Sequence, residues 1–128
     1  MQLIDISARK AKAFTIIELI IVVTLIGVMA AFAIPNYTKA IAKAYRKDAT
    51  VNLQAIYAAQ KIYFNANGNY YGGNGTNTAS INTNLGLGII ASGGTTYTCP
   101  TGGATFSCTA NLVIDPDLSV TDTSPTPS

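Results

Sequence analysis

Apolar residues are unevenly spread along this chain of 128 residues, and their pattern divides it into segments. The run FTIIELIIVVTLIGVMAAFAI, residues 14–34, is almost continuously apolar. An α-helix needs about 20 apolar residues to cross a hydrocarbon layer of roughly 30 Å. A strand of a soluble protein is far shorter. The run therefore predicts a helix that can span a membrane, preceded by a short leader at residues 1–13.

A second helical pattern follows directly, in residues 35–64. This stretch is rich in Ala and contains no Gly, and its apolar or small residues recur close to helical spacing. They are Ile41, Ala44, Tyr45, Val51, Ala55, Ala58 and Ile62. We expect an amphipathic helix that continues the apolar one. Pro35 lacks a backbone donor and crowds the preceding turn, so a kink or local unwinding is expected between Gly27 and Pro35.

The composition changes near residue 65, where turn-forming residues begin to dominate. Ten of the eleven glycines lie beyond this point, together with many Asn, Thr and Ser. The segments between the turns are too short for helices, and their alternation predicts strands near residues 95–99, 104–108 and 111–114. Residues 65–118 are thus expected to form a small antiparallel sheet packed on the second helix, which makes the fold class α+β. Residues 119–128 have no apolar pattern and are predicted to be a solvated tail.

Charge and composition narrow the classes of function. The chain has no His, which excludes imidazole acid–base chemistry and imidazole metal sites. All eight Lys and Arg residues lie in the first 61 positions, so the C-terminal half offers no basic face to nucleic acid. The basic residues Arg9, Lys10 and Lys12 before the apolar run are typical of the cytoplasmic flank of a membrane segment.

No set of residues predicts an enzyme or a cofactor site, because no nucleophile, base and orienting group can be assembled. The carboxylates Asp115, Asp117 and Asp122 offer oxygen ligands to Ca²⁺. The Asp-Pro-Asp run at 115–117 is explained more simply as a turn. The sequons that begin at Asn36 and Asn74 are candidate glycan acceptors. We therefore expect no catalytic residue, no resident metal and no cofactor.

The two cysteines, Cys99 and Cys108, both lie on the side of the apolar run that the charge bias places outside the cytoplasm. Oxidising compartments support disulfides, which favours a bond between them. The competing interpretation is a metal site with two thiolate ligands. It lacks further Cys or His residues to complete four ligands.

Glu18 is the one carboxylate inside the apolar run, and two interpretations account for it. A charge near the centre of a membrane helix costs about 2.5 to 3.5 kcal/mol and usually has a partner. If the chain were cut before Phe14, the new α-amino group of a neighbouring subunit would supply that partner. The alternative is a carboxylate in the first helical turn that the helix dipole favours. The residues alone do not separate the two.

A cleaved secretory signal is a further alternative, because Ala31-Phe32-Ala33 follows a hydrophobic stretch. The apolar run is longer than the usual 7 to 15 residues of such a signal, and it contains a carboxylate. Both features favour a retained helix.

Residues 13–37, AFTIIELIIVVTLIGVMAAFAIPNY, closely resemble the N-terminus of type IV prepilins and of the related type II secretion pseudopilins. The shared pattern is a basic leader, a cleavage site before Phe, a Glu five residues into the mature chain, and an apolar helix that ends near a Pro. The resemblance is specific from residue 9 to about 37 and extends only in general layout beyond. This chain has Ala13 where the family usually has Gly, so slower processing is expected.

The resemblance implies a structural subunit rather than an enzyme. It implies that a prepilin peptidase cuts between Ala13 and Phe14 and methylates the Phe14 amine, and that Glu18 pairs with Phe14 of an adjacent subunit. The region between Gly27 and Pro35 is then able to lose helicity in the filament.

The resemblance likewise implies that precursors lie in the inner membrane and polymerise, with the help of assembly machinery, into a helical surface filament of identical subunits. The monomer is not expected to bind nucleic acid. A pseudopilus of a secretion system is the main alternative, since it shares every N-terminal residue discussed. Electron conduction along the aromatic residues is a weaker one, because aromatics at helical spacing usually serve packing.

Overall fold

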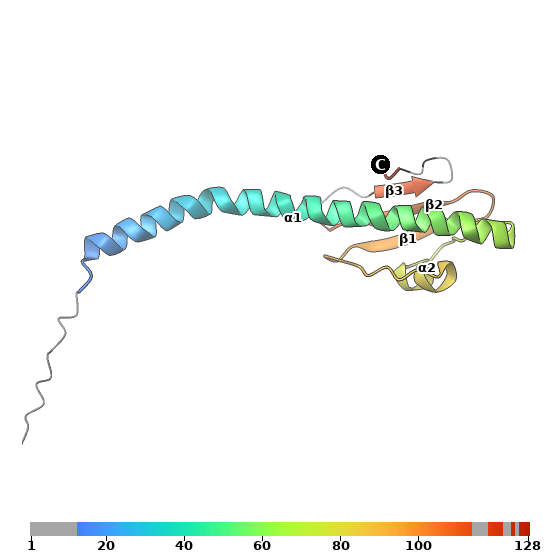
Figure 1. Cartoon of the computed structure of the whole chain (residues 1–128), viewed down its shortest axis with the longest axis horizontal. Coiled ribbons are helices and arrows are strands. Elements are labelled where there is room, and N and C mark those ends of the chain that lie inside the picture. Colours follow the sequence, from blue (N-terminus) through green and yellow to red (C-terminus); the bar gives the residue numbers. More distant parts are fainter. Residues whose placement is uncertain (1–12, 114–117, 122–123, 125) are drawn as a thin grey trace, which may run out of the picture. The chain divides into compact units, whose positions relative to one another are not determined.

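The computed structural model describes residues 13–113, 118–121, 124 and 126–128. Within these ranges the order of elements is α1 (Ile16–Asn67), α2 (Thr78–Leu85), β1 (Thr96–Thr101), β2 (Ser107–Asn111) and β3 (Leu118–Thr121) (Figure 1). This α+β architecture confirms the predicted fold class: a long N-terminal helix and a small antiparallel sheet. The chain divides into two compact units, with the boundary between Tyr37 and Thr38.

The two predicted helical segments form one α-helix, α1, which continues three residues beyond the predicted end. It ends at Gly68, which has a φ of 73° and donates its amide hydrogen to the carbonyl of Phe64 (2.8 Å). A glycine in the left-handed conformation is a common helix terminator because it has no Cβ to clash. The helix is continuous through Gly27 and Pro35, so the single chain has no unwound segment there.

The core of the second unit lies between one face of α1 and one face of the sheet. On α1 the buried face consists of Ala49, Leu53, Ile56, Ala59 and Gln60. Facing it from the strands are alternate residues, as the pleat of a sheet requires: Tyr97, Cys99, Cys108, Ala110, Leu118 and Val120. Burying a Leu or Ile side chain stabilises a fold by about 1.5 to 3 kcal/mol, so this layer supplies most of the driving force for folding.

The sheet has the order β1-β2-β3, and both pairs are antiparallel. Thr98 lies opposite Thr109, and the register becomes irregular between Thr98 and Thr101. The predicted strand at 95–99 corresponds to β1. The strands predicted at 104–108 and 111–114 are wrong in their limits: β2, at Ser107–Asn111, overlaps the end of the first and the start of the second, and Val113 is exposed beyond its end.

Strand β3 corrects the prediction that the tail begins at residue 119. Val120 is fully buried, and Ser119 exchanges two backbone hydrogen bonds with Ser128 (both 3.2 Å). The alternation Leu118-Ser119-Val120-Thr121 does carry a strand pattern, although it is only four residues long. The predicted boundary between residues 118 and 119 falls inside this alternation.

Helix α2 was also missed, since the turn-rich segment was judged too short for helices. Its start has a capping box, in which Asn77 Oδ1 accepts from the amide of Ser80 and Ser80 Oγ accepts from the amide of Asn77 (both 2.9 Å). Its end is Gly86, with a φ of 65°. Both signals are readable in the sequence. Only Ile81 of α2 is buried, so the helix lacks the periodic apolar pattern on which the prediction relied.

Gln60 connects the helix to the loop that follows it. Its side chain is fully buried, yet Nε2 donates to the Tyr71 carbonyl (2.6 Å) and Oε1 accepts from the Tyr71 amide (2.9 Å). Nε2 also lies 3.6 Å from Cys108 Sγ. A buried polar group is tolerated when its hydrogen bonds are made. Gln60 therefore fixes the chain after α1 against the sheet.

Two glycines allow that loop to cross the β1–β2 hairpin closely. A Cβ at Gly72 would collide with the Thr101 carbonyl, and a Cβ at Gly102 would collide with the Gly72 backbone. Beside them, Tyr70 and Gly103 exchange two backbone hydrogen bonds (2.8 and 2.9 Å). Such a short backbone distance is available only without side chains.

Candidate functional site

The start of α1 is a capping box built by Thr15 and Glu18. The Glu18 amide donates to Thr15 Oγ1 (3.3 Å), and the Thr15 amide donates to Glu18 Oε2 (3.2 Å). The Thr15 hydroxyl donates to the same oxygen (3.1 Å). Two of the free amide groups at the helix start are thereby satisfied. The pattern Thr-x-x-Glu at 15–18 signals this cap in the sequence, and the sequence analysis overlooked the role of Thr15.

The geometry gives Glu18 a capping role in its own chain. It also leaves the side chain able to pair with a neighbouring subunit. Glu18 sits in the first turn, as the helix-dipole interpretation requires. Both Thr15 bonds end on Oε2, and among the described residues no hydrogen bond reaches Oε1. A carboxylate has about four acceptor positions. The cap thus orients the side chain and leaves one oxygen available to a donor from another molecule.

The bond between Ala13 and Phe14 lies immediately before the helix. Residues 13–15 are outside regular secondary structure, and all three are exposed. The Phe14 side chain is 85% exposed. A peptide bond in an exposed, non-helical segment can enter the extended conformation that a peptidase needs. Residues 1–12 of the leader, with their basic residues, lie outside the described residues.

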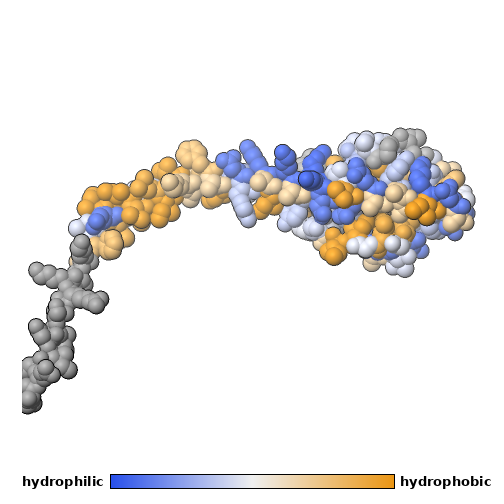
Figure 2. Space-filling model, viewed as in Figure 1, coloured by the Kyte–Doolittle hydropathy of each residue, from blue (hydrophilic) through white to orange (hydrophobic). Residues whose placement is uncertain are grey.

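The apolar run forms the first part of α1, and no residue of it is buried within the chain. By length and composition this helix can cross a membrane. Figure 2 shows its hydrophobic surface in orange. Such an exposed apolar surface is too costly to leave in water, so it needs lipid or protein around it.

Polar groups within this run are satisfied by the helix itself. The Thr24 hydroxyl donates to the carbonyls of Ile20 (3.0 Å) and Ile21 (2.9 Å), and Asn36 Nδ2 donates to the Phe32 carbonyl (3.1 Å). Internal satisfaction of polar groups is the requirement for a segment in lipid. Ala31-Phe32-Ala33, the alternative signal-peptidase motif, lies in the interior of α1.

Cys99 and Cys108 are joined by a disulfide, with Cα atoms 4.1 Å apart, which confirms the favoured interpretation. Both residues are fully buried on adjacent strands. The metal alternative is wrong, because the bond consumes both thiols. Among the described residues no group of three potential ligands from His, Cys, Asp and Glu is present. The carboxylates Asp115, Asp117 and Asp122, which the sequence offers as oxygen ligands but which are explained more simply by a turn, lie outside the described residues.

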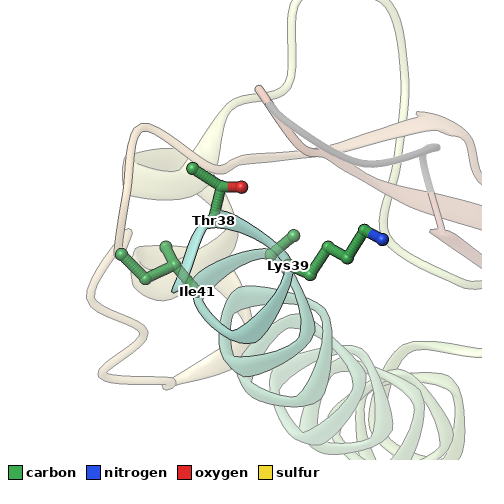
Figure 3. Close-up of a pocket in the computed structure, with 4 residues that line it drawn as sticks. Thr38, Lys39 and Ile41 are labelled. Atoms are coloured by element: carbon green, nitrogen blue, oxygen red, sulfur yellow. The ribbon is translucent and has the colours of Figure 1, made fainter. Parts of the chain in front are cut away.

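The hollow on α1 near the start of the second unit lacks the features of a catalytic site. It is lined by Thr38, Lys39, Ile41 and Ala42, all from one helix. In Figure 3 the labelled side chains point in three different directions, so their polar groups do not converge.

These observations define a class of protein: a subunit with an exposed apolar helix, a capped carboxylate in its first turn, and a small disulfide-bonded α+β domain. The prokaryotic N-terminal methylation motif matches residues 8–34. The chain is 48% identical, over 61 residues, to the "Type IV major pilin protein PilA" of Myxococcus xanthus (strain DK1622). That match covers 48% of this chain and 28% of the relative, so the chain spans well under two thirds of the relative's length.

The motif and the relative show that the N-terminal part of this chain is similar to type IV pilins. The family is structural rather than enzymatic. The motif and the exposed apolar helix are consistent with a membrane-anchored precursor.

Proposed function

We propose that this protein is the structural subunit of a type IV pilus, held in the inner membrane by residues 14–34 and polymerised through α1 into a surface fibre. The observation that carries the proposal is the apolar first part of α1, which is entirely exposed in the single chain. Lipid covers it before assembly, and the same segments of neighbouring subunits cover it afterwards. Small residues in the run, such as Gly27 and Ala30, permit close helix approach.

Processing at the leader creates the assembly signal. Cleavage between Ala13 and Phe14 and methylation of the new amine place a cation at the helix start. Oε1 of Glu18 in an adjacent subunit accepts from this amine, while Oε2 remains in the Thr15 cap. The pairing offsets the cost of a carboxylate in an apolar environment, and it does so only in the polymer.

The net charge of the processed chain is compatible with dense packing of subunits. Residues 14–128 contain five acidic and five basic side chains, because cleavage removes Asp5, Arg9, Lys10 and Lys12. A filament of neutral subunits avoids long-range repulsion. Loss of helicity between Gly27 and Pro35 belongs, in this proposal, to the filament, because the single chain is helical there.

The decisive test is electron microscopy of surface fibres from cells that express the chain, with mass spectrometry of the fibre subunit. We expect long fibres whose subunit begins at a methylated Phe14. Short, periplasm-spanning fibres that require a secretion system would indicate a pseudopilus. A soluble monomer that begins at Ile34 would contradict the proposal.

Glu18→Gln isolates the charge from the cap. Gln is also accepted in a capping box, so helix α1 keeps its start while the negative charge is lost. The yield of fibres should fall sharply. The amount of subunit in the membrane should stay unchanged, and its measurement serves as the control. If the variant assembles as well as the parent, the charge pair is not the assembly signal.

A further inference from the structure

The loop between α1 and α2 presents a turn whose ends are held and whose tip is exposed. The Thr76 amide donates to the Gly73 carbonyl (3.3 Å), which closes a four-residue turn with Asn74 and Gly75 in its central positions. Gly75 has a φ of 85°, as the third residue of a type II turn requires. Cys99 anchors both ends: its carbonyl accepts from the Gly73 amide (2.9 Å), and its amide donates to Thr76 Oγ1 (2.7 Å).

We propose that Asn74 is a site of spontaneous deamidation in the folded protein. The Gly75 backbone nitrogen loses its proton to hydroxide and attacks Cγ of Asn74. A bond forms between this nitrogen and Cγ, and the bond from Cγ to Nδ2 breaks as the departing nitrogen takes a proton from water. Ammonia leaves, a five-membered succinimide is formed, and the hydroxide is regenerated. Water then opens the ring at either carbonyl and yields aspartate or isoaspartate. Water is the sole co-reactant, and no atom is oxidised or reduced.

The surroundings of the reacting atoms favour this step. Both residues are exposed, and within the described part of the chain neither the Gly75 amide nor the Asn74 side chain makes a hydrogen bond. No atom lies within 4 Å of the position that a Cβ would occupy at Gly75. The space beside Gly75 is therefore open to solvent and to hydroxide. The glycines on both sides give the tip conformational freedom between its two anchors.

A second Asn-Gly pair, Asn67-Gly68, serves as an internal comparison. Here the Gly68 amide donates to the Phe64 carbonyl (2.8 Å), and Asn67 Nδ2 donates to the Tyr63 carbonyl (3.0 Å). Both reacting groups are thus held by the last turn of α1, and the end of the helix must open before attack. The two pairs have the same intrinsic chemistry, so the structure alone makes them unequal.

Deamidation would introduce a charge into a long uncharged stretch of the chain. No Lys, Arg, Asp or Glu occurs between Lys61 and Asp115. A carboxylate at position 74 is the first charge in this stretch. Isoaspartate would also lengthen the backbone by one carbon, between two hydrogen bonds that tie the turn to the disulfide-bonded strand. Old and newly made molecules would consequently differ in this loop.

The experiment follows both pairs in the full chain in detergent micelles, at mildly alkaline pH and below the unfolding temperature. Peptide mass spectrometry in ¹⁸O-labelled water detects newly formed Asp and isoAsp. Asn74 should convert about tenfold faster than Asn67, since opening at Asn67 breaks hydrogen bonds that Asn74 lacks. After denaturation and reduction the two rates should become similar. Asn74→Gln should abolish the modification at 74 and leave the Asn67 rate unchanged.

Equal rates at the two pairs in the folded chain would overturn the proposal. Slower reaction of Asn74 in the folded chain than in the denatured chain would overturn it as well, because it would show that the turn protects the residue.

Discussion

Gly93 lies against the ring of Tyr45, and a Cβ at this position would collide with the ring carbons. Its φ of 59° is also one that residues with side chains rarely adopt. This contact fixes the loop before β1 against α1. The Asp48 carboxylate reinforces it by accepting a hydrogen bond from Ser92 Oγ (2.8 Å). The absence of a side chain at Gly93 thus allows the loop to pack closely against the helix.

We expect Gly93→Ala to lower the free energy of unfolding by about 1 to 3 kcal/mol, because the added methyl group must displace the ring or the loop. Urea denaturation followed by circular dichroism measures the change. Gly88→Ala is the matched control: no atom lies within 4 Å of its Cβ position and its φ is not positive, so a change within about 0.5 kcal/mol is expected. Equal effects of the two substitutions would contradict the assigned contact.

The buried phenol of Tyr97 makes the stability of the fold depend on pH in the alkaline range. Burial raises the pKa of its phenol above 10.0, the hydrogen bond donated by Asn52 (2.9 Å) lowers it, and the Asp48 carboxylate raises it again. The folded protein therefore holds this proton at a pH where the unfolded chain has released it. By linkage, stability is constant with respect to this group below about pH 10 and falls as the pH rises from there through the folded pKa.

Tyr97→Phe should flatten that alkaline decline, because Phe does not titrate. The measurement is the free energy of unfolding at several pH values from 8 to 11. Tyr37→Phe, at an exposed tyrosine of α1, provides the control and should leave the decline unchanged. If the parent and Tyr97→Phe lose stability in parallel, another group causes the decline.

At the scale of a structural element, the disulfide stabilises the hairpin formed by β1 and β2. The bond joins residues nine positions apart and lies beside the irregular register between Thr98 and Thr101. It restricts the unfolded chain, and it also holds the two strands where the regular ladder of hydrogen bonds is interrupted. Its burial against Gln60 ties the same hairpin to α1.

Replacing Cys99 and Cys108 together by Ala should lower the free energy of unfolding by about 2 to 3 kcal/mol. The parent protein unfolded in the presence of reductant should show the same midpoint as the double variant. A double variant as stable as the oxidised parent would show that the strands hold this geometry unaided.

At the scale of the whole molecule, the two units have different requirements. Among the residues that the structure describes, the apolar part of α1 contributes nothing to the buried core, and every buried hydrophobic residue belongs to the second unit. Its core combines residues from α1, α2 and all three strands. The second unit therefore has what it needs to fold in water, and the first unit has what it needs to associate with lipid or with copies of itself.

A chain of residues 35–128 should accordingly be a soluble monomer that unfolds cooperatively, while the full chain should require detergent. Analytical ultracentrifugation and urea denaturation test the two statements. Persistent aggregation of the shortened chain would show that a further apolar surface, such as the exposed Ile90 and Val113, needs a partner.

The features that the sequence determined by itself are those that depend on neighbouring residues. The apolar run, the helical spacing after it and the motif from Ala13 to Glu18 are local patterns, and they predicted α1, its apolar first part and the similarity to type IV pilins. With two cysteines in the chain, the disulfide had one intramolecular pairing. The cap of α1 by Thr15 and the start of α2 at Asn77 also have local sequence signals, although neither was among the predictions.

The tertiary structure decided the features that depend on residues far apart in the chain. Gln60 lies on an Ala-rich helix, and only the fold shows that it binds the Tyr71 backbone from within the core. The close crossing of Gly72 over Gly102 and the burial of Val120 in a third strand depend in the same way on distant partners. A short polar segment buries too little surface to choose its own conformation, so its structure is set by what packs against it.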